Sequence, residues 1–205
     1  MVYIPKHFAV ADQETLIAFM RRYSFATLVS TGAAGLIASH VPLLYEPAAG
    51  GAGRLLGHLA RANPQLADLA DGREVMAIFH GPHAYVSPTW YATHPAVPTW
   101  NYAVVHAYGT VEAMTDAAAL RDLLTKLSDT YEAGNAAPWR LADQPGRYIE
   151  GMLRGIGGFA VAITRLEGKF KLNQNRDAVD RERVAAALEA SGDPEARNVA
   201  TLMKR

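Results

Sequence analysis

The spacing of hydrophobic residues changes period along the chain, and each change marks an expected element. Residues 12–22 carry apolar side chains at helical spacing, with Asp12 as a plausible N-cap, and predict a first helix. The period then falls to two over 25–31 and 36–45, with a turn at Gly32–Gly35 between them. These two segments predict a β-hairpin.

Further strand-like segments follow a flexible loop at Glu46–Gly53. The expected strands are 54–60, 74–80, 83–87, 99–114 and 157–166. Gly81 and Pro82 are expected to divide the second of these strands from the third. The three prolines of residues 88–98 exclude a regular element there. The helices expected beyond the first are a short one over 64–71, a longer one over 116–134, one or two turns at 148–154, and two within 177–205.

The order of these elements favours one fold class. Strands with short connections come first and helices flank them, without βαβ alternation, which disfavours a doubly wound sheet. We therefore expect an α+β protein, mainly antiparallel β, built as a barrel with flanking helices. At 205 residues we expect one domain over 1–205, with about 177–205 as a helical C-terminal extension.

Composition and charge remove several function classes. The absence of cysteine excludes disulfide scaffolds, thiolate metal sites and thiol catalysis. The 20 Lys and Arg residues balance 20 Asp and Glu, so no global charge attracts DNA. No P-loop, nucleophile-elbow or zincin motif is present, and His80 and His83 have no third ligand at a helpful spacing, so no metal is expected. No long apolar run or signal core is visible, and we expect a cytoplasmic protein with no membrane association.

A strand that leads into a helix start predicts an anion site. The segment contains His58, Arg61 and Asn63, and the helix is expected to begin at Pro64. Free backbone N–H groups at a helix start, beside an arginine, suit a phosphate, and His58 could add a donor. The alternative is a capped helix with a surface arginine.

Aromatic residues gather in two segments bounded by prolines. Two of the three tryptophans, Trp90 and Trp100, lie there with Ser87 and Asn101. Rigid segments that carry aromatic rings suit a flat ring ligand or a subunit interface. Plain core packing is the alternative.

Two further polar segments could contact a ligand. Ser39 and His40 interrupt an apolar strand, whereas Lys171, Gln174 and Asn175 follow the last expected strand. Lysines and amides can bond ring carbonyls and nitrogens or a phosphate. A histidine at the sheet rim and a solvated loop are the alternatives.

Six collinear pieces, spread over nearly the whole chain, carry a resemblance to a known family. They are Tyr3–Phe8, Phe25–Ser30, Gly57–Pro64, Tyr85–Tyr91, Val97–Tyr102 and Lys169–Arg176. Together they resemble the PaiB family of FMN-binding proteins. One departure is Asn173, where the family usually has a serine, so no hydroxyl role carries over to that position.

The resemblance implies a split β-barrel similar to pyridoxamine-phosphate oxidase, a homodimer with FMN at the subunit interface, and a negative transcriptional regulator. It assigns no catalytic residue. With the segments above it makes the following residues the candidate FMN contacts: Ser39, His40, His58, Arg61, Asn63, Ser87, Trp90, Trp100, Asn101, Lys171, Gln174 and Asn175.

Three functions stay open at this point. The first is an FMN-binding regulator that acts directly or through a partner; the second is a flavin-dependent oxidoreductase; the third is a haem-binding or haem-degrading relative. Direct DNA binding has little support from charge, because residues 165–183 hold six basic residues against four acidic ones. No helix-turn-helix pattern is convincing, since acidic residues dilute the tail helices.

Overall fold

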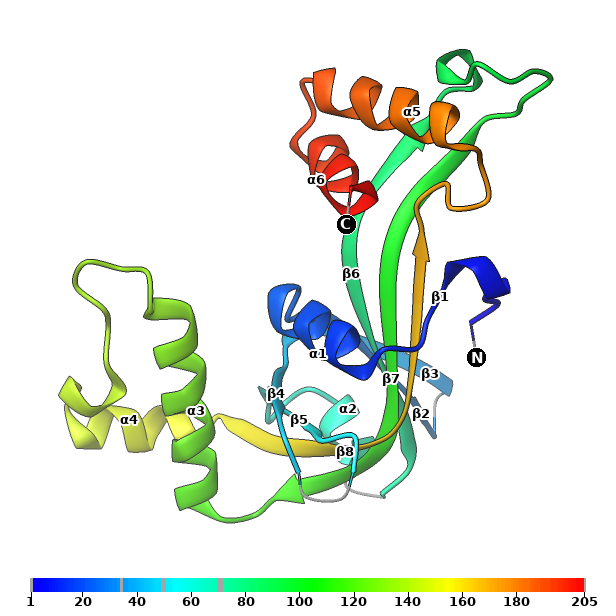
Figure 1. Ribbon diagram of the computed structural model, residues 1–205. Coiled ribbons are helices and arrows are strands. Elements are labelled where there is room, and N and C mark those ends of the chain that lie inside the picture. The colour runs from blue at the N-terminus through cyan, green and yellow to red at the C-terminus, as the bar shows by residue number, and fades with distance from the viewer. Residues whose placement is uncertain (1, 34, 49–50, 70–71, 205) are drawn as a thin grey trace. The chain divides into compact units, whose positions relative to one another are not determined.

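The computed structural model describes residues 2–33, 35–48, 51–69 and 72–204 (Figure 1). Its strands are β1 (Ala9–Val10), β2 (Phe25–Gly32), β3 (Gly35–Pro42), β4 (Leu44–Glu46), β5 (Arg54–Ala60), β6 (Glu74–Val86), β7 (Thr99–Met114) and β8 (Ile156–Lys171). Its α-helices are α1 (Gln13–Arg22), α2 (Gln65–Leu69), α3 (Ala117–Glu132), α4 (Gly146–Leu153), α5 (Ala178–Ala190) and α6 (Pro194–Met203). Short 3-10 turns are η1 (Lys6–Phe8), η2 (Pro88–Trp90) and η3 (Leu141–Asp143).

Within the described residues, eight strands form one sheet in the order β3-β2-β6-β7-β8-β5-β4, and β1 pairs with β8. The β1–β8, β2–β3, β4–β5 and β5–β8 pairings are all antiparallel. This confirms the predicted α+β, mainly antiparallel class. The first helix, the hairpin, the 54–60 and 99–114 strands and the two tail helices are also confirmed.

The chain forms two compact units. Unit 1 consists of Met1–Tyr23, Phe79–His106 and Glu167–Arg205, and unit 2 of Ser24–Ile78 and Ala107–Leu166. The strands β6, β7 and β8 contribute residues to both units. The single domain expected over the whole chain stays a prediction.

Unit 2 has a leucine-rich core between α3 and the sheet. Leu120, Leu123 and Leu127 lie on one face of α3, and they pack with Leu56 of β5 and Ala160 of β8. Their spacing of three and four residues puts them on one helical stripe. Burying this stripe gives α3 the tertiary packing that a helix of its length needs.

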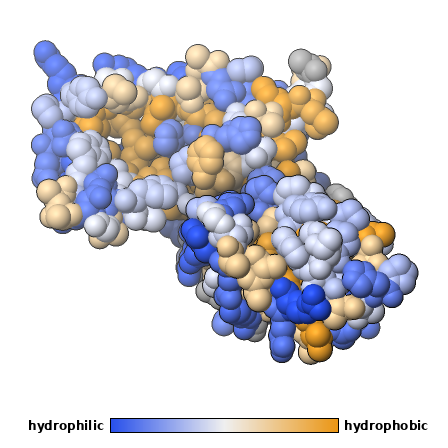
Figure 2. Space-filling view, turned by 90° about the horizontal axis from the view of Figure 1, so that it is seen from above, coloured by the Kyte–Doolittle hydropathy of each residue, from blue (hydrophilic) through white to orange (hydrophobic). Residues whose placement is uncertain are grey.

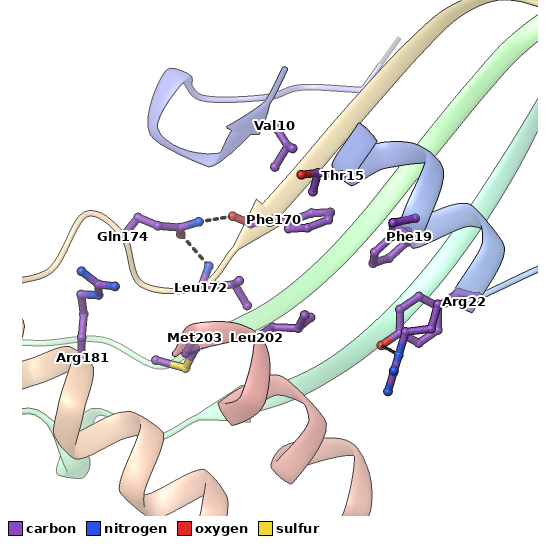
Figure 3. Close-up of a pocket in the computed structure, with 12 residues that line it drawn as sticks. Val10, Thr15, Phe19, Arg22, Phe170, Leu172, Gln174, Arg181, Leu202 and Met203 are labelled. Carbon is purple, nitrogen blue, oxygen red and sulfur yellow. Dashed lines mark hydrogen bonds between the residues drawn. The ribbon is translucent and has the colours of Figure 1, made fainter. Parts of the chain in front are cut away.

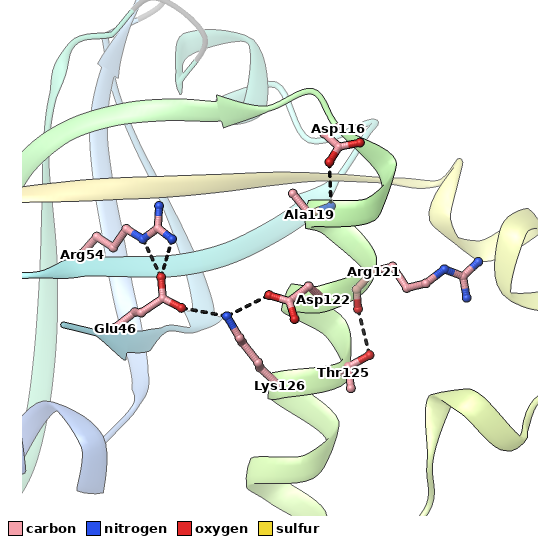
Figure 4. A network of polar contacts seen from close by, with 8 residues as sticks. All are labelled: Glu46, Arg54, Asp116, Ala119, Arg121, Asp122, Thr125 and Lys126. Carbon is pink, nitrogen blue, oxygen red and sulfur yellow. Dashed lines mark hydrogen bonds and ion pairs between the residues drawn. The ribbon is translucent and has the colours of Figure 1, made fainter. Parts of the chain in front are cut away.

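Polar contacts fasten α3 to the β4–β5 hairpin of unit 2 (Figure 4). Glu46 accepts hydrogen bonds from Arg54 Nε at 2.6 Å and Lys126 Nζ at 2.7 Å, and Lys126 also pairs with Asp122 at 2.8 Å. The Lys126 hydrogen bond, with help from Arg54, lowers the pKa of Glu46. These side chains are partly exposed, so they contribute less than the leucine core.

A buried amide fixes α2 on the β2–β3 hairpin. Gln65 is fully buried, and its Nε2 donates to the Leu28 carbonyl at 3.0 Å and to Ser30 Oγ at 3.0 Å. A buried amide left unpaired would cost free energy, so these bonds specify where α2 sits.

Unit 1 has its own core beneath the tail helices. Val184 and Leu188 of α5 and Val199 and Ala200 of α6 are buried together with Val86 of β6. These helices and the end of β6 lie side by side in Figure 1. The tail is therefore packed against the strands, and its helices share one apolar core.

A buried carboxylate fixes the loop that follows η2. Asp180 is 1% exposed, and its Oδ1 accepts hydrogen bonds from the N–H groups of Ala92 at 2.7 Å and Thr93 at 3.2 Å. This contact joins α5 to a loop almost 90 residues away in sequence. The prediction that 88–98 lacks a regular element is confirmed apart from η2.

The predicted break at Gly81 and Pro82 is wrong, because β6 runs unbroken to Val86. β6 lies between β2 and β7 in the sheet, and the strand continues through Pro82 although a proline removes one N–H from the ladder. Gly81 serves a packing role, because a Cβ there would lie 2.5 Å from the Phe19 ring.

Two other strands differ from expectation. The 36–45 strand divides at Leu43, whose side chain is buried and whose N–H donates to the Ser24 carbonyl at 2.9 Å. The last strand continues to Lys171, because β1 pairs with its end in the register Ala9↔Lys169. A two-residue strand such as β1 leaves no periodic signal, so the extension could not be predicted.

Candidate functional site

Arg61 of unit 2 is held firmly by backbone carbonyls. Its Nε donates to the Arg154 carbonyl and its Nη2 to the Ile156 carbonyl, both at 2.9 Å, and its backbone N–H donates to Gly155 at 2.8 Å. The guanidinium is thereby fixed against the turn between α4 and β8, and its Nη1 makes no hydrogen bond to the described residues. A fixed guanidinium with remaining donors suits a phosphate oxygen.

A cavity of about 600 Å³ adjoins this arginine. It is lined by two further arginines, Arg121 and Arg154, and by the acidic residues Asp116 and Glu150. Asp116 is engaged as the N-cap of α3, where its carboxylate accepts from the N–H groups of Ala118 and Ala119. Arg121 and Arg154 were missed from the sequence, because they are separated from Arg61 by many residues and match no motif.

The expected free N–H groups at the start of α2 are absent. Asn63 Oδ1 accepts from the Gln65 N–H at 2.9 Å, and the next N–H groups donate to the carbonyls of Asn63 and Pro64. The N–H of Asn63 itself donates to the Ala60 carbonyl. The helix start is therefore capped, as the alternative interpretation held, and any anion must be bound by side chains.

His58 has a buried ring nitrogen without a partner. His58 lies on β5 opposite Gly158 of β8, and its Nδ1 makes no hydrogen bond within the described residues. Burial lowers the pKa of His58 below its ordinary value of 6.5, so the ring is neutral at neutral pH. An orphaned buried nitrogen beside a strand end is consistent with a ligand contact.

The remaining candidates of unit 2 lie on β3. Ser39 Oγ accepts a hydrogen bond from Asn63 Nδ2 at 2.9 Å, so these two candidates are brought together. His40 is exposed and pairs with Thr27 in the hairpin register. No described contact joins His40 to the other candidates.

In unit 1, Trp100 forms an exposed aromatic patch with His83 and Tyr85. The Trp100 side chain is 52% exposed; its ring stacks on His83 at 5.9 Å and meets Tyr85 edge-on at 6.1 Å. His83 and Tyr85 were not among the candidates, although they alternate on one strand and so share a face. A shallow pocket of about 310 Å³ lies over Trp100, His83 and His80.

Two lysines on β8, Lys169 and Lys171, contact aromatic or backbone groups of the same segment of unit 1. Lys171 donates to Thr99 Oγ1 and to the Trp100 carbonyl, and burial together with the charge of Lys169 lowers its pKa. Lys169 is buried, donates to the Tyr3 carbonyl at 2.8 Å and lies 5.5 Å from the Tyr102 ring. Their spacing of two on a strand was the signal that could have identified Lys169.

Four candidates have structural contacts in unit 1. Ser87 caps η2 through the Thr89 N–H, and Trp90 packs against the core of the tail helices. Asn101 is fully buried, with Nδ2 directed at the Met203 sulfur. The Gln174 amide closes the turn after β8, where it bonds to the Leu172 N–H and the Phe170 carbonyl.

The last candidate, Asn175, is exposed beside the unusual Asn173. Asn173 is buried, has a φ of 63° and donates from Nδ2 to the Tyr91 hydroxyl at 3.2 Å. Asparagine adopts the left-handed region more readily than serine does, which gives the departure at this position a physical reason.

Each unit by itself holds a donor set that fits one part of a flavin mononucleotide. In unit 2, Arg61 and its cavity offer the fixed cationic donors that a phosphate needs. In unit 1, Trp100 offers an accessible aromatic surface for a ring. The described residues contain no group of three or more metal-ligating side chains and no helix long and apolar enough to cross a membrane.

Comparison with known proteins also points to FMN binding. The family described as "Putative FMN-binding domain" matches residues 2–165. Protease synthase and sporulation protein PAI 2 of Bacillus subtilis is 34% identical over 99% of this chain and 97% of its own. An uncharacterised protein of Emericella nidulans is 32% identical over 74% of this chain and 72% of its own.

Solved structures support the fold. The flavocytochrome Anf3 of Azotobacter vinelandii matches with a TM-score of 0.63 and 16% identity, over 88% of this chain and 78% of that chain. The FAD and haem binding protein of Mycobacterium smegmatis matches with a TM-score of 0.59 and 20% identity, over 87% and 79%. Fold and family model together define an FMN-binding flavoprotein of the split-barrel class. Within that class, the chain belongs to the PaiB family, to which PAI 2 is assigned.

Proposed function

We propose that this protein is a negative transcriptional regulator that binds FMN and acts through a partner rather than by reading DNA itself. The observation that carries the FMN part is Arg61, whose guanidinium is fixed by two carbonyls at 2.9 Å and keeps donors for the phosphate. The regulatory part is supported by the resemblance to the PaiB family and by the name of the relative PAI 2, a protease synthase and sporulation protein.

Charge argues for a partner. The tail helices come closest to a helix-turn-helix arrangement, because only Ser191–Asp193 separates α5 from α6. However, Asp177, Glu182, Glu189, Asp193 and Glu195 oppose the basic residues of this segment. We therefore expect weak binding to DNA with a slope of log affinity against log salt near −0.9 for each phosphate neutralised.

An anisotropy titration at about 150 mM salt tests the DNA claim. A promoter fragment and a scrambled control should bind equally and weakly, with and without FMN. Nanomolar affinity for the promoter fragment, with much weaker binding of the scrambled control, would overturn the proposal that the protein acts through a partner. A visible spectrum of the purified protein, taken in parallel, should show flavin bands.

We further propose a homodimer in the cytoplasm, with FMN at the subunit interface. The support is the exposed aromatic patch, with Trp100 at 52% and Tyr85 at 47% exposure. Apolar side chains gather in patches bordered by polar ones on the face shown in Figure 2. Symmetric pairing commonly covers such surfaces. Sedimentation at micromolar concentration should give a dimer, and a monomer would contradict this proposal.

A flavin-dependent oxidoreductase is the second candidate. The pocket over Trp100 and His83 favours it, because an open space beside a ring-binding surface could admit a small substrate. Oxidation of a reduced nicotinamide by the FMN-loaded protein, above the rate of free FMN, would support this candidate. No turnover, together with partner-dependent repression, would support the regulator.

A further inference from the structure

A separate cavity lies entirely within unit 1 (Figure 3). Its volume is about 580 Å³, and it is bounded by α1, the end of β8, α5 and α6. Among the lining residues, Gln174 alone was a candidate FMN contact, and both ends of its amide are engaged by the turn after β8. The candidate flavin contacts therefore leave this cavity unexplained.

Aromatic rings form one wall of the cavity. Phe19 lies 5.1 Å from Phe170 and 4.6 Å from Tyr23, measured between ring centroids. Phe19 is held in place on Gly81, where a Cβ would collide with its ring. A rigid wall of this kind suits the flat body of an aromatic ligand.

Aliphatic side chains form the opposite wall. On α6, Met203 is buried and Leu202 is half-buried, and Leu172 continues the side of β8 that carries Phe170. Ala18 on α1 is small and leaves the space between the walls open. Two apolar walls around a space of this size favour an apolar ligand body over a hydrated one.

Two arginines reach the rim, and none of the lining residues is acidic. Arg181 of α5 has no side-chain partner within the described residues, and Arg22 of α1 donates only to the Tyr23 hydroxyl, at 3.1 Å. Figure 3 shows them extending from two different helices. Cations without counter-charges beside an apolar space are complementary to an anionic ligand.

We propose that this cavity binds a small organic acid whose aromatic body lies between the two walls and whose anionic head meets Arg181. The site is independent of the FMN contacts proposed above. Because α5 and α6 both line it, ligand binding stabilises the tail helices by binding the folded state alone.

Two fluorescent probes test the proposal. Anilinonaphthalenesulfonate is an aromatic anion, and N-phenylnaphthylamine has the same ring body without the charge. Both should bind saturably, one per chain, to protein already saturated with FMN. Arg181→Gln should weaken the anionic probe about threefold to tenfold and leave the neutral probe unchanged, as expected for a partly exposed charge pair.

Matched variants separate the cavity from the surface. Arg183→Gln removes another exposed arginine of α5 that lines none of the described cavities, and it should change neither probe. Ala18→Trp should fill the space and abolish binding of both probes, while the helical circular dichroism stays unchanged.

Three results would overturn the proposal. One is binding of the anionic probe that is equal in wild type, Arg181→Gln and Ala18→Trp. Another is stoichiometric displacement of the probe by FMN, which would give the cavity to the flavin. The third is probe binding that appears only when a dimer is diluted to monomers, which would show that a second copy of the chain fills the cavity.

Discussion

Unit 1 and unit 2 hold their positive charges in different ways. In unit 2, Arg61 is fixed by two backbone carbonyls, and its charge is carried by a rigid, planar guanidinium. In unit 1, Lys169 and Lys171 lie two residues apart on β8, beside aromatic rings, and burial lowers the pKa of Lys171. A guanidinium held in one orientation is therefore the better preformed anion site, whereas a desolvated amine is the one whose charge responds to pH.

The largest expected effect concerns Arg61. Arg61→Ala should weaken FMN about tenfold to a hundredfold, because each charged hydrogen bond is worth roughly 1.5–3 kcal/mol. Riboflavin, which lacks the phosphate, should bind wild type and variant alike. Fluorescence quenching titrations with both flavins measure the difference.

The control for Arg61 is Arg73→Ala, which removes another unit 2 arginine that donates to a carbonyl, that of Thr31. FMN affinity should not change in this control. If Arg61→Ala also leaves FMN affinity unchanged, the phosphate belongs elsewhere, with Lys171 or Arg176 as the next candidates.

The second effect concerns Gln65, the uncharged side chain that holds α2 on the β2–β3 hairpin of unit 2. Gln65→Leu should lower the free energy of unfolding by about 1 kcal/mol, because the bonds from Nε2 to the Leu28 carbonyl and Ser30 Oγ are lost, while removal of the unpartnered Oε1 offsets part of the cost. Urea denaturation measures it. Gln144→Leu, which removes a single bond to Arg140 from a half-buried position, should cost far less. If both variants lose the same free energy of unfolding, the buried bonds of Gln65 contribute no more to stability than the partly exposed bond of Gln144.

The third effect tests the lysine of unit 1. If Lys171 contacts the flavin, FMN affinity should fall as Lys171 loses its proton. Because its pKa is lowered, this fall should begin at a lower pH than it would for a lysine with the ordinary pKa of 10.5. Lys171→Arg should remove this fall, because a guanidinium stays charged. FMN affinities of wild type and Lys171→Arg, measured between about pH 7 and 9.5, test this expectation. If the two pH profiles coincide, Lys171 does not contact the flavin.

The same shift predicts the sign of a stability change. At pH values below 10.5 and above the lowered pKa of folded Lys171, the unfolded chain holds the lysine proton more tightly than the folded chain does. The free energy of unfolding should therefore rise with pH through this window. A wild-type slope no greater than that of Lys171→Met would contradict this expectation.

The smallest effect concerns His58 of unit 2. Burial lowers its pKa, so as pH falls below 6.5 the unfolded chain takes up the proton first and stability decreases. His58→Gln should flatten this part of the melting temperature profile between about pH 5 and 7. An unchanged profile would assign the acid sensitivity to other groups.

Local patterns were sufficient for much of the fold. The helical spacing behind Asp12, the period of two over β2 and the Asp116 cap each describe a segment that is stabilised mainly by near neighbours, and the structure confirms them. The break predicted at Pro82 failed because the pairing of β6 with its neighbours, which is a tertiary property, carries the strand through the proline.

The candidate site divides in the same way. The amino-acid pattern was enough to predict the class of the protein and the residue types that suit a phosphate and a ring, because these depend on chemistry within short segments. The folded chain was needed to show that Arg61 is fixed by the turn between α4 and β8, that Arg121 and Arg154 share its cavity, and that the start of α2 is already capped. The physical reason is that carbonyl partners, burial and shared cavities arise between segments far apart in the chain, where no periodic pattern records them.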